Sequence, residues 1–348
     1  MSTIVAASGG GIYGSGLTWV GGNAPTSADD AQLDATSGNV TITAGAASRS
    51  LDCTGYTGTL THSAGATLTL GDATVGLSNI ALKLVSGMTY TKGDPTSSAF
   101  AFVSTSTTQQ TVDFGSKTLG DLTFNGAGGD WVTSNTGGPS QAITVGTITL
   151  TAGKFTGNIS CLAFSSSNAN VRELGACTFV ITQTSGSAWD CTTATNLTVS
   201  PSVTVTISDT GGSNKTVNGG AGKVYGLFTV TAGGAGAVIF QDSFDVGGLT
   251  VTGPKTIKGT KTKTLTASGG LAISGTAGNI VTLDTEDGLG TWSIHSDLAV
   301  SLDYLSVTRN VAAGVVPFYA GTHSTDGGTN TNWTFTDPPN NQVNIRSF

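Results

Sequence analysis

Gly248-Leu-Thr-Val251 is followed by Gly270-Leu-Ala-Ile273, and both are versions of a short strand phrase that recurs along the chain. Other copies are Gly120-Asp-Leu-Thr-Phe124, Gly146-Thr-Ile-Thr-Leu150, Thr195-Asn-Leu-Thr-Val199, Leu227-Phe-Thr-Val230 and Tyr304-Leu-Ser-Val307, with earlier versions in Ser50-Leu-Asp-Cys53 and Asn79-Ile-Ala-Leu82. The later apolar positions are separated by 26, 49, 31, 21, 22 and 34 residues; they are Leu122, Ile148, Leu197, Phe228, Leu249, Leu271 and Leu305. Most of these intervals fall in the range of about 20–35 residues that is typical of solenoid coils.

Other short segments between these phrases alternate apolar and polar residues with a period of two, as half-buried strands do. Examples are Thr67-Leu-Thr-Leu70 and Val203-Thr-Val-Thr-Ile207. The fold class that the pattern predicts is all-β, a parallel β-helix or β-solenoid of roughly ten to twelve irregular coils of about 20–35 residues. A tandem array of β-sandwich domains is the alternative, because sandwiches also place strands at short, regular intervals.

The composition agrees with an all-β chain. Gly accounts for 51 of 348 residues and charged residues for only 10%, so the charged residues that favour helices are scarce. The net charge of -7 and the sparse Lys and Arg argue against nucleic acid as a partner. We expect no membrane insertion, because no apolar stretch approaches the length of a transmembrane span.

The two ends differ in sequence from the middle of the chain. We predict an N-terminal cap or attachment segment at 1–34, a solenoid body at 35–310, and a C-terminal cap and tail at 311–348. A cap is needed because the edge strand of an open solenoid invites polymerisation. The candidate cap or contact residues are Trp19, Pro25, Asp29, Asp30, Tyr319, Trp333, Phe335 and Phe348.

These ends resemble bacteriophage and phage-derived β-solenoid proteins. The resemblance lies in Trp19, Pro25 and the Asp29-Asp30 pair at the start, and in Ser324-Thr-Asp-Gly-Gly followed by Asn332-Trp-Thr-Phe335 at the end. It implies a virion structural component of the tail fibre, tailspike or capsid decoration type. It also implies that the chain is homotrimeric, that it contacts other virion proteins, and that a host surface glycan is a further partner. The resemblance carries no catalytic residues.

We therefore expect a non-enzymatic protein displayed on the surface of a phage particle. The stretch Met1–Ser8 has no basic region, and the first positively charged residue is Arg49. We accordingly expect no signal peptide and synthesis in the host cytoplasm. The alternatives are a tailspike that binds or depolymerises host polysaccharide and a bacterial surface adhesin.

The acidic groups are the candidates for the depolymerase alternative. Asp284 and Glu286 would lie on one side of an extended strand, and glycoside hydrolysis uses two carboxylates. Other acidic groups are Asp29 with Asp30 and Asp242 with Asp245, although such residues are also common in turns. Asp284-Thr-Glu-Asp-Gly288 hints at a calcium loop, but His295 stands where an EF-hand needs Glu.

The remaining motifs predict no cofactor. Gly9-Gly-Gly-Ile-Tyr-Gly14 matches the dinucleotide pattern, but no helix-forming sequence follows it. Zinc is not expected, because the cysteines have no CxxC spacing and the three histidines are far apart in sequence. We interpret the cysteines as small buried strand residues; they are Cys53, Cys161, Cys177 and Cys191. Lys261 and Lys263 are expected on one face of a strand, as solvated edge lysines, in a basic group with Lys255 and Lys258.

Overall fold

The structure is a computed structural model that describes residues 2–93, 98–136, 144–208, 210–231 and 233–339. It is nearly all β, with 50% strand and 2% helix, and it forms a parallel β-solenoid of about 13 turns. The chain divides into two compact units. Unit 1 comprises residues 1–180 with 195–198, and unit 2 comprises 181–194 with 199–348.

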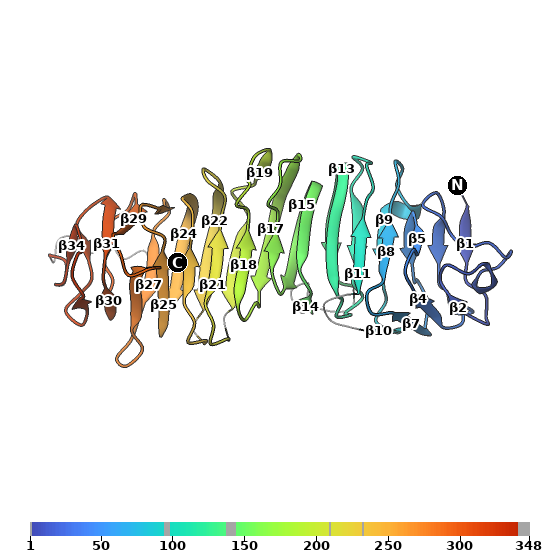
Figure 1. The fold of residues 1–348 in the computed structure, drawn as a ribbon, viewed down its shortest axis with the longest axis horizontal. Coiled ribbons are helices and arrows are strands. Elements are labelled where there is room, and N and C mark those ends of the chain that lie inside the picture. The colour runs from blue at the N-terminus through green and yellow to red at the C-terminus, as the bar shows by residue number, and fades with distance from the viewer. Residues whose placement is uncertain (1, 94–97, 137–143, 209, 232, 340–348) are drawn as a thin grey trace. The chain divides into compact units, whose positions relative to one another are not determined.

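Unit 1 has three stacks of parallel strands (Figure 1). The first stack contains β1 (Thr3–Val5), β3 (Asp30–Gln32), β6 (Ser50–Asp52), β9 (Ile80–Lys83), β12 (Gln110–Asp113) and the later parts of β13 (Asp121–Ser134) and β15 (Ile148–Cys161). The second contains β2 (Gly11–Ile12), β4 (Val40–Ile42), β7 (Thr59–His62) and β10 (Thr89–Lys92). The third contains β5 (Ala47–Ser48), β8 (Thr67–Leu70), β11 (Ala99–Phe102), the first parts of β13 and β15, and β16 (Phe164–Ser165).

The remaining elements of unit 1 are short or lie at its end. They are the 3-10 helices η1 (Gly16–Thr18) and η2 (Leu77–Asn79), with strands β14 (Thr144–Val145), β17 (Arg172–Ile181) and β19 (Leu197–Val199).

Unit 2 repeats this arrangement. Its longest stack contains β18 (Gly186–Asp190), β21 (Lys215–Asn218), β23 (Val238–Phe240), β25 (Lys255–Gly259), β28 (Val281–Thr285), β30 (Leu305–Val307) and β33 (Thr325–Asp326). A second stack contains β20 (Thr204–Ser208), β22 (Val224–Thr231), β24 (Phe244–Thr252) and β27 (Leu271–Ser274). The third joins the start of β24 to β26 (Thr264–Ala267), β29 (Trp292–Ser296) and β31 (Asn310–Gly314), while β32 (Phe318–Tyr319) pairs with β34 (Trp333–Thr334).

The repeated phrase predicted the stacking register in large part. Leu122 lies opposite Ile148 in unit 1, and Leu249 lies between Phe228 and Leu271 in unit 2. Leu305 departs from this pattern, because it pairs with Val281 in the longest stack of unit 2. The earlier copies also depart from it, because Leu51 and Leu82 pair with each other in the first stack of unit 1. The solenoid prediction is confirmed, and the parallel pairing of the described strands rules out tandem antiparallel sandwiches.

The core forms where the alternating apolar side chains of successive coils meet. In unit 1 the buried Phe124 ring lies 4.8 Å from Phe102 and 5.1 Å from Phe155, measured between ring centroids. In unit 2, Phe228 packs against Tyr225 and Phe244 in the same way. Each such side chain contributes roughly 1.5–3 kcal/mol by leaving water, and no coil has this core without its neighbours.

The glycines directly before the phrases at Gly248 and Gly270 stand at corners where stacked coils lie too close for a side chain. A Cβ atom on Gly269 would lie 2.0 Å from the carbonyl oxygen of Gly247, and a Cβ on Gly247 would lie 2.7 Å from that of Gly226. Since a Cβ atom has no room there, the glycines at positions 247 and 269 follow from the stacking itself, whereas a Cβ on the phrase-leading Gly248 would meet nothing closer than 3.3 Å.

Parallel pairing begins at Thr3 in unit 1 and extends to Asp326 and Thr334 in unit 2. The segments 1–34 and 311–348 therefore contribute strands to coils, beyond the body expected at 35–310. Their predicted roles as caps or attachment segments stay predictions.

Candidate functional site

The first coil of unit 1 closes part of its own backbone edge. After β2 and η1 the chain turns back, and Trp19 forms an antiparallel bridge with Ala6. The Ala7 N–H donates to the Thr18 carbonyl at 2.8 Å, and the Val20 N–H donates to the Val5 carbonyl at 2.9 Å. The Ile12 carbonyl accepts from the Thr18 hydroxyl at 2.6 Å. These bonds occupy backbone groups that would otherwise be open to another strand.

Trp19 is buried within this coil. Its Nε1–H donates to the Tyr13 carbonyl at 2.7 Å, and its ring meets the Tyr13 ring edge-on at 5.0 Å. The Tyr13 hydroxyl lies 2.7 Å from the Ser48 Oγ, and burial raises the pKa of Tyr13. The indole thus packs within the first coil, and the Tyr13 hydroxyl joins this coil to the next. The role of Trp19 as a cap residue stays a prediction.

Three apolar side chains on the same coil remain in solvent. Leu17 is 91% exposed, Val20 65% and Ile12 51%. We call these three residues the first-coil patch. Sequence reasoning singled out Trp19 and missed its neighbours, because the sequence gives no sign of which side of the turn faces the core.

Asp29, Asp30 and Pro25 lie at the start of the second coil. Asp30 is buried and forms a bidentate pair with the buried Arg49, and it also accepts from the Ser50 hydroxyl at 2.6 Å. Burial alone would raise the pKa of Asp30, but the hydrogen bonds and charge of Arg49 hold it below its ordinary value. Asp29 is more exposed and accepts from Thr26 and Ser2. Pro25 is buried.

The candidate residues of the other end lie in the last coils of unit 2. Tyr319 and Trp333 belong to the paired strands β32 and β34, and Phe335 follows them, half-buried. The Trp333 Nε1–H donates to the Asn310 Oδ1 at 2.9 Å, and the ring packs edge-on against Phe318 at 5.3 Å. Phe348 lies outside the described residues.

The acidic residues proposed for polysaccharide cleavage each have partners in the fold. Asp284 holds Arg309 through two bonds of 2.8 and 2.6 Å. Glu286 accepts from the Gln241 amide at 2.9 Å and from the Thr260 hydroxyl at 2.7 Å. The prediction of two carboxylates on one strand is not confirmed, because β28 ends at Thr285 and Glu286 lies just beyond it. Each carboxylate accepts hydrogen bonds from neighbouring side chains.

The other acidic groups act in turns. Asp242 accepts from the backbone N–H groups of Gly219 and Gly220, and burial raises its pKa. Asp287 accepts from the Leu289 N–H at 2.9 Å and lies 3.6 Å from the Lys261 Nζ. These contacts are the ordinary turn roles of aspartate.

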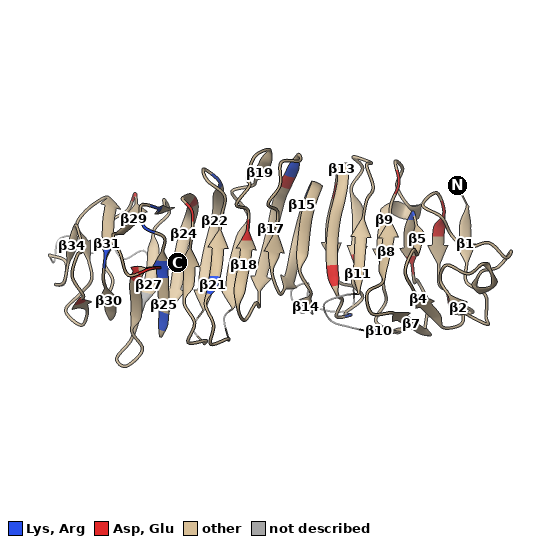
Figure 2. Cartoon of the chain, viewed as in Figure 1, with Lys and Arg blue, Asp and Glu red and all other residues tan. Residues whose placement is uncertain are grey.

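The prediction for Lys261 and Lys263 was wrong. They flank Thr262, whose φ is +65°, in the turn between β25 and β26 rather than on a strand. Lys255 is buried in β25, a basic strand in Figure 2, and its Nζ donates to the Gly234 carbonyl at 2.8 Å. The four lysines therefore form no shared basic surface.

The four cysteines are buried and none is in a disulfide, as predicted for small core residues. Burial raises the pKa of the Cys53, Cys161 and Cys177 thiols. Among the described residues no group of three or more His, Cys, Asp or Glu side chains could hold a metal ion. Within Gly9–Gly14, Gly10 serves packing, since a Cβ on it would lie 2.0 Å from the Asn39 carbonyl oxygen, while a Cβ on Gly9 or Gly14 would meet nothing within 4 Å.

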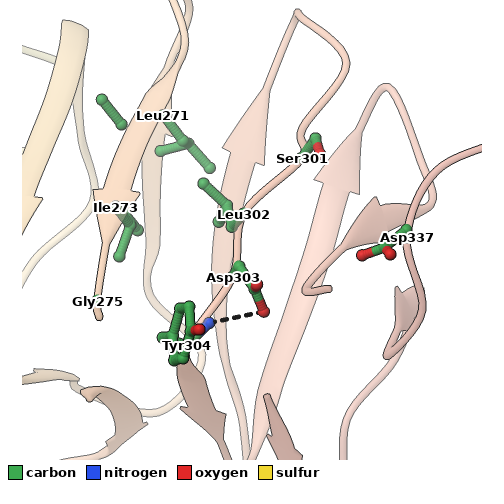
Figure 3. A pocket seen from close by; sticks show the side chains of 9 residues that line it. Leu271, Ile273, Gly275, Ser301, Leu302, Asp303, Tyr304 and Asp337 are labelled. Carbon is green, nitrogen blue, oxygen red and sulfur yellow. Dashed lines mark hydrogen bonds between the residues drawn. The ribbon is translucent and has the colours of Figure 1, made fainter. Parts of the chain in front are cut away.

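One shallow pocket of about 510 Å³ lies in unit 2 beside β27. Figure 3 shows Leu271 and Ile273 on one side, Leu302, Asp303 and Tyr304 on the other, and Asp337 reaching in from the C-terminal segment. The Asp303 Oδ2 lies 2.7 Å from the His323 Nδ1, and the His323 ring stacks flat on Tyr304 at 4.6 Å. Burial would raise the pKa of Asp303, but hydrogen bonds from His323 and the Tyr304 N–H hold it below its ordinary value.

The fold defines the class of protein, a parallel β-solenoid. No family model matches the chain, and comparisons with curated proteins and with solved structures find no significant match. No helix among the described residues is long and apolar enough to cross a membrane.

Proposed function

We propose that this chain is a non-enzymatic structural component of a phage particle, displayed on the particle surface as a decoration protein, fibre or spike. It is held there by its first coil. The observation that carries the proposal is the first-coil patch, Ile12, Leu17 and Val20, three exposed apolar side chains on the coil that sequence reasoning assigned to attachment.

A partner would bind the first-coil patch through side-chain contacts and not by adding a strand to the edge of β1. Thr18–Val20 already covers the end of β1, so a partner does not need to add a strand there. Ile12, Leu17 and Val20 lie within nine residues on one coil, and contiguous exposed apolar surface is typical of a protein interface. The surroundings are acidic, because residues 1–48 contain no Lys or Arg and Asp29 and Asp34 are at least partly exposed.

The solenoid suits a display role on physical grounds. Short Thr and Ser side chains cover the outer faces of many strands, so few long side chains must be ordered on the surface. The acidic residues that a depolymerase would need are engaged in ion pairs and hydrogen bonds. Both points support a structural component over the enzyme alternative.

Incorporation into particles tests the proposal. The tagged chain is expressed in the host during particle assembly, and purified particles are probed for the tag. The double variant Leu17→Asp with Val20→Asp is expected to lose incorporation at least tenfold, while Leu289→Asp, at an exposed leucine in a unit 2 loop, is incorporated normally. Absence of the wild-type chain from particles, or equal incorporation of both variants, contradicts the proposal.

The resemblance also leads us to propose a homotrimer. Native mass spectrometry of the purified protein distinguishes a trimer from the 34.6 kDa monomer. A monomer at micromolar concentration would remove the trimer from the proposal and leave attachment by the first coil to be tested on particles.

A further inference from the structure

The second stack of unit 2 is interrupted after β27. One edge of β27 pairs with β24, in the register Leu249 to Leu271 and Val251 to Ile273. No described strand pairs with its other edge. The next segment on this side, residues 300–304, bonds onward instead: the Leu302 N–H donates to the Tyr319 carbonyl at 2.8 Å, and the Tyr319 N–H donates to the Val300 carbonyl at 3.0 Å.

The pocket of about 510 Å³ is the space left by this interruption. It runs along Leu271, Ala272 and Ile273 of β27, about 10 Å of extended chain. At the far end of β27 the coils meet again, because a Cβ on Gly275 would lie 2.3 Å from the Tyr304 carbonyl oxygen. Figure 3 shows the opening between Leu271 and Leu302, with Tyr304 at its lower end. The gap therefore accepts only a short segment.

Backbone N–H and C=O groups of β27 face this gap. The Gly270 carbonyl accepts from the Leu249 N–H at 3.2 Å, so it faces β24. Successive residues of a parallel strand direct their N–H and C=O groups to opposite neighbours, and those of Leu271 and Ile273 accordingly face the gap. An unpaired strand edge of this kind binds extended chains by adding a strand.

The lining sets the chemistry of the ligand. The half-buried Leu271 presents apolar surface beside the buried Ile273 and Leu302, and Asp337 adds an exposed carboxylate at the opening. The Asp303 carboxylate lies there too, already held by His323 and the Tyr304 N–H. An added strand would alternate its side chains between these two environments. We propose that this gap binds a short extended peptide segment of a partner protein, in which apolar and basic residues alternate.

A labelled peptide tests the site directly. The probe is a fluorescein-labelled Lys-Val-Lys-Val-Lys-Val peptide, titrated with the full purified chain and followed by fluorescence anisotropy. We expect saturable binding that weakens at least tenfold when alternate peptide nitrogens are methylated, because methylation removes the hydrogen bonds of strand addition. Replacing the peptide lysines with glutamates should weaken binding by a similar factor.

Matched protein variants separate the site from general attraction to an acidic protein. Asp337→Asn removes an exposed carboxylate of the pocket and is expected to weaken binding about two- to fivefold. Asp245→Asn, on β24 outside the pocket lining, is expected to leave binding unchanged. The proposal is overturned if binding does not saturate at millimolar protein. It is also overturned if neither N-methylation of the peptide nor Asp337→Asn changes the affinity. Either outcome leaves particle attachment through the first coil unaffected.

Discussion

Gly269 lies against the Gly247 carbonyl of the preceding coil so closely that a Cβ on Gly269 would be 2.0 Å from that oxygen. Contact between Gly269 and Gly247 of successive coils leaves no room for a side chain at this corner. It also makes the corners of the coils the positions where the fold tolerates side chains least.

Gly269→Ala should therefore destabilise the protein by about 1–3 kcal/mol, since the corner must open to admit the methyl group. Urea denaturation followed by circular dichroism measures the change in the free energy of unfolding. The matched control is Gly212→Ala, where a Cβ meets nothing within 4 Å. If Gly212→Ala lowers the free energy of unfolding as much as Gly269→Ala does, close stacking is not the cause of the destabilisation.

The buried Asp30–Arg49 pair should be far more sensitive than a surface pair. Asp30→Asn leaves Arg49 buried without its counter-charge, and we expect a loss of about 3–5 kcal/mol in unfolding free energy. Glu173→Gln, which breaks the partly exposed pair of Glu173 with Lys154 at 3.2 Å, should cost less than about 1 kcal/mol. Chemical denaturation of both variants gives the comparison, and similar losses in the two would contradict the expected role of burial.

His62 should make unit 1 sensitive to acid. Its ring is buried, with Nδ1 3.0 Å from the Tyr90 hydroxyl and Nε2 3.0 Å from the Ala66 carbonyl, and burial lowers its pKa to about 4. In the unfolded state the pKa of His62 is near its ordinary value of 6.5, so the unfolded chain binds the proton more readily than the folded one. Stability from the neutral ring is therefore complete above pH 6.5 and falls by about 3 kcal/mol as the pH drops toward 4.

Denaturation midpoints between pH 4 and 7 test this dependence. His62→Gln should flatten the pH profile whatever its effect on stability at pH 7. His295→Gln, at a partly exposed ring that lies 2.9 Å from the Asp297 carboxylate, serves as the control. An unchanged slope in His62→Gln would assign the acid sensitivity to other groups.

Asp284 should matter for stability and not for polysaccharide cleavage. Its partly exposed pair with Arg309 is bidentate, so Asp284→Asn is expected to cost about 1 kcal/mol in a thermal unfolding experiment. Purified wild-type protein spotted on a lawn of the host should give no clearing of capsule. A halo that disappears in Asp284→Asn or Glu286→Gln would instead support the depolymerase alternative.

The repeat allowed much of the stacking to be predicted. Leu122 with Ile148, and Phe228 with Leu249 and Leu271, stand in one register because each coil must present apolar side chains at the same place. Leu305 has the same local sequence but belongs to another stack. The local sequence of a phrase does not determine which of the three stacks its strand joins.

Features that depend on contacts between distant coils could not be predicted. Asp30 was singled out as an end residue, but its buried partner Arg49 is brought to it by stacking of β3 on β6. The exposed side of Leu17 and the unpaired edge of β27 likewise depend on which neighbour is present, and a single sequence does not encode that in any local pattern.

Location on the particle tests the central claim most directly. Electron cryomicroscopy of particles carrying the chain, with a gold label on an N-terminal tag, measures where the first coil lies. The proposal predicts solenoid density on the particle surface, with the label at the point of attachment and the density absent in the Leu17→Asp, Val20→Asp variant. Particles that lack the solenoid, or that hold it with the first coil free in solvent, would contradict the account.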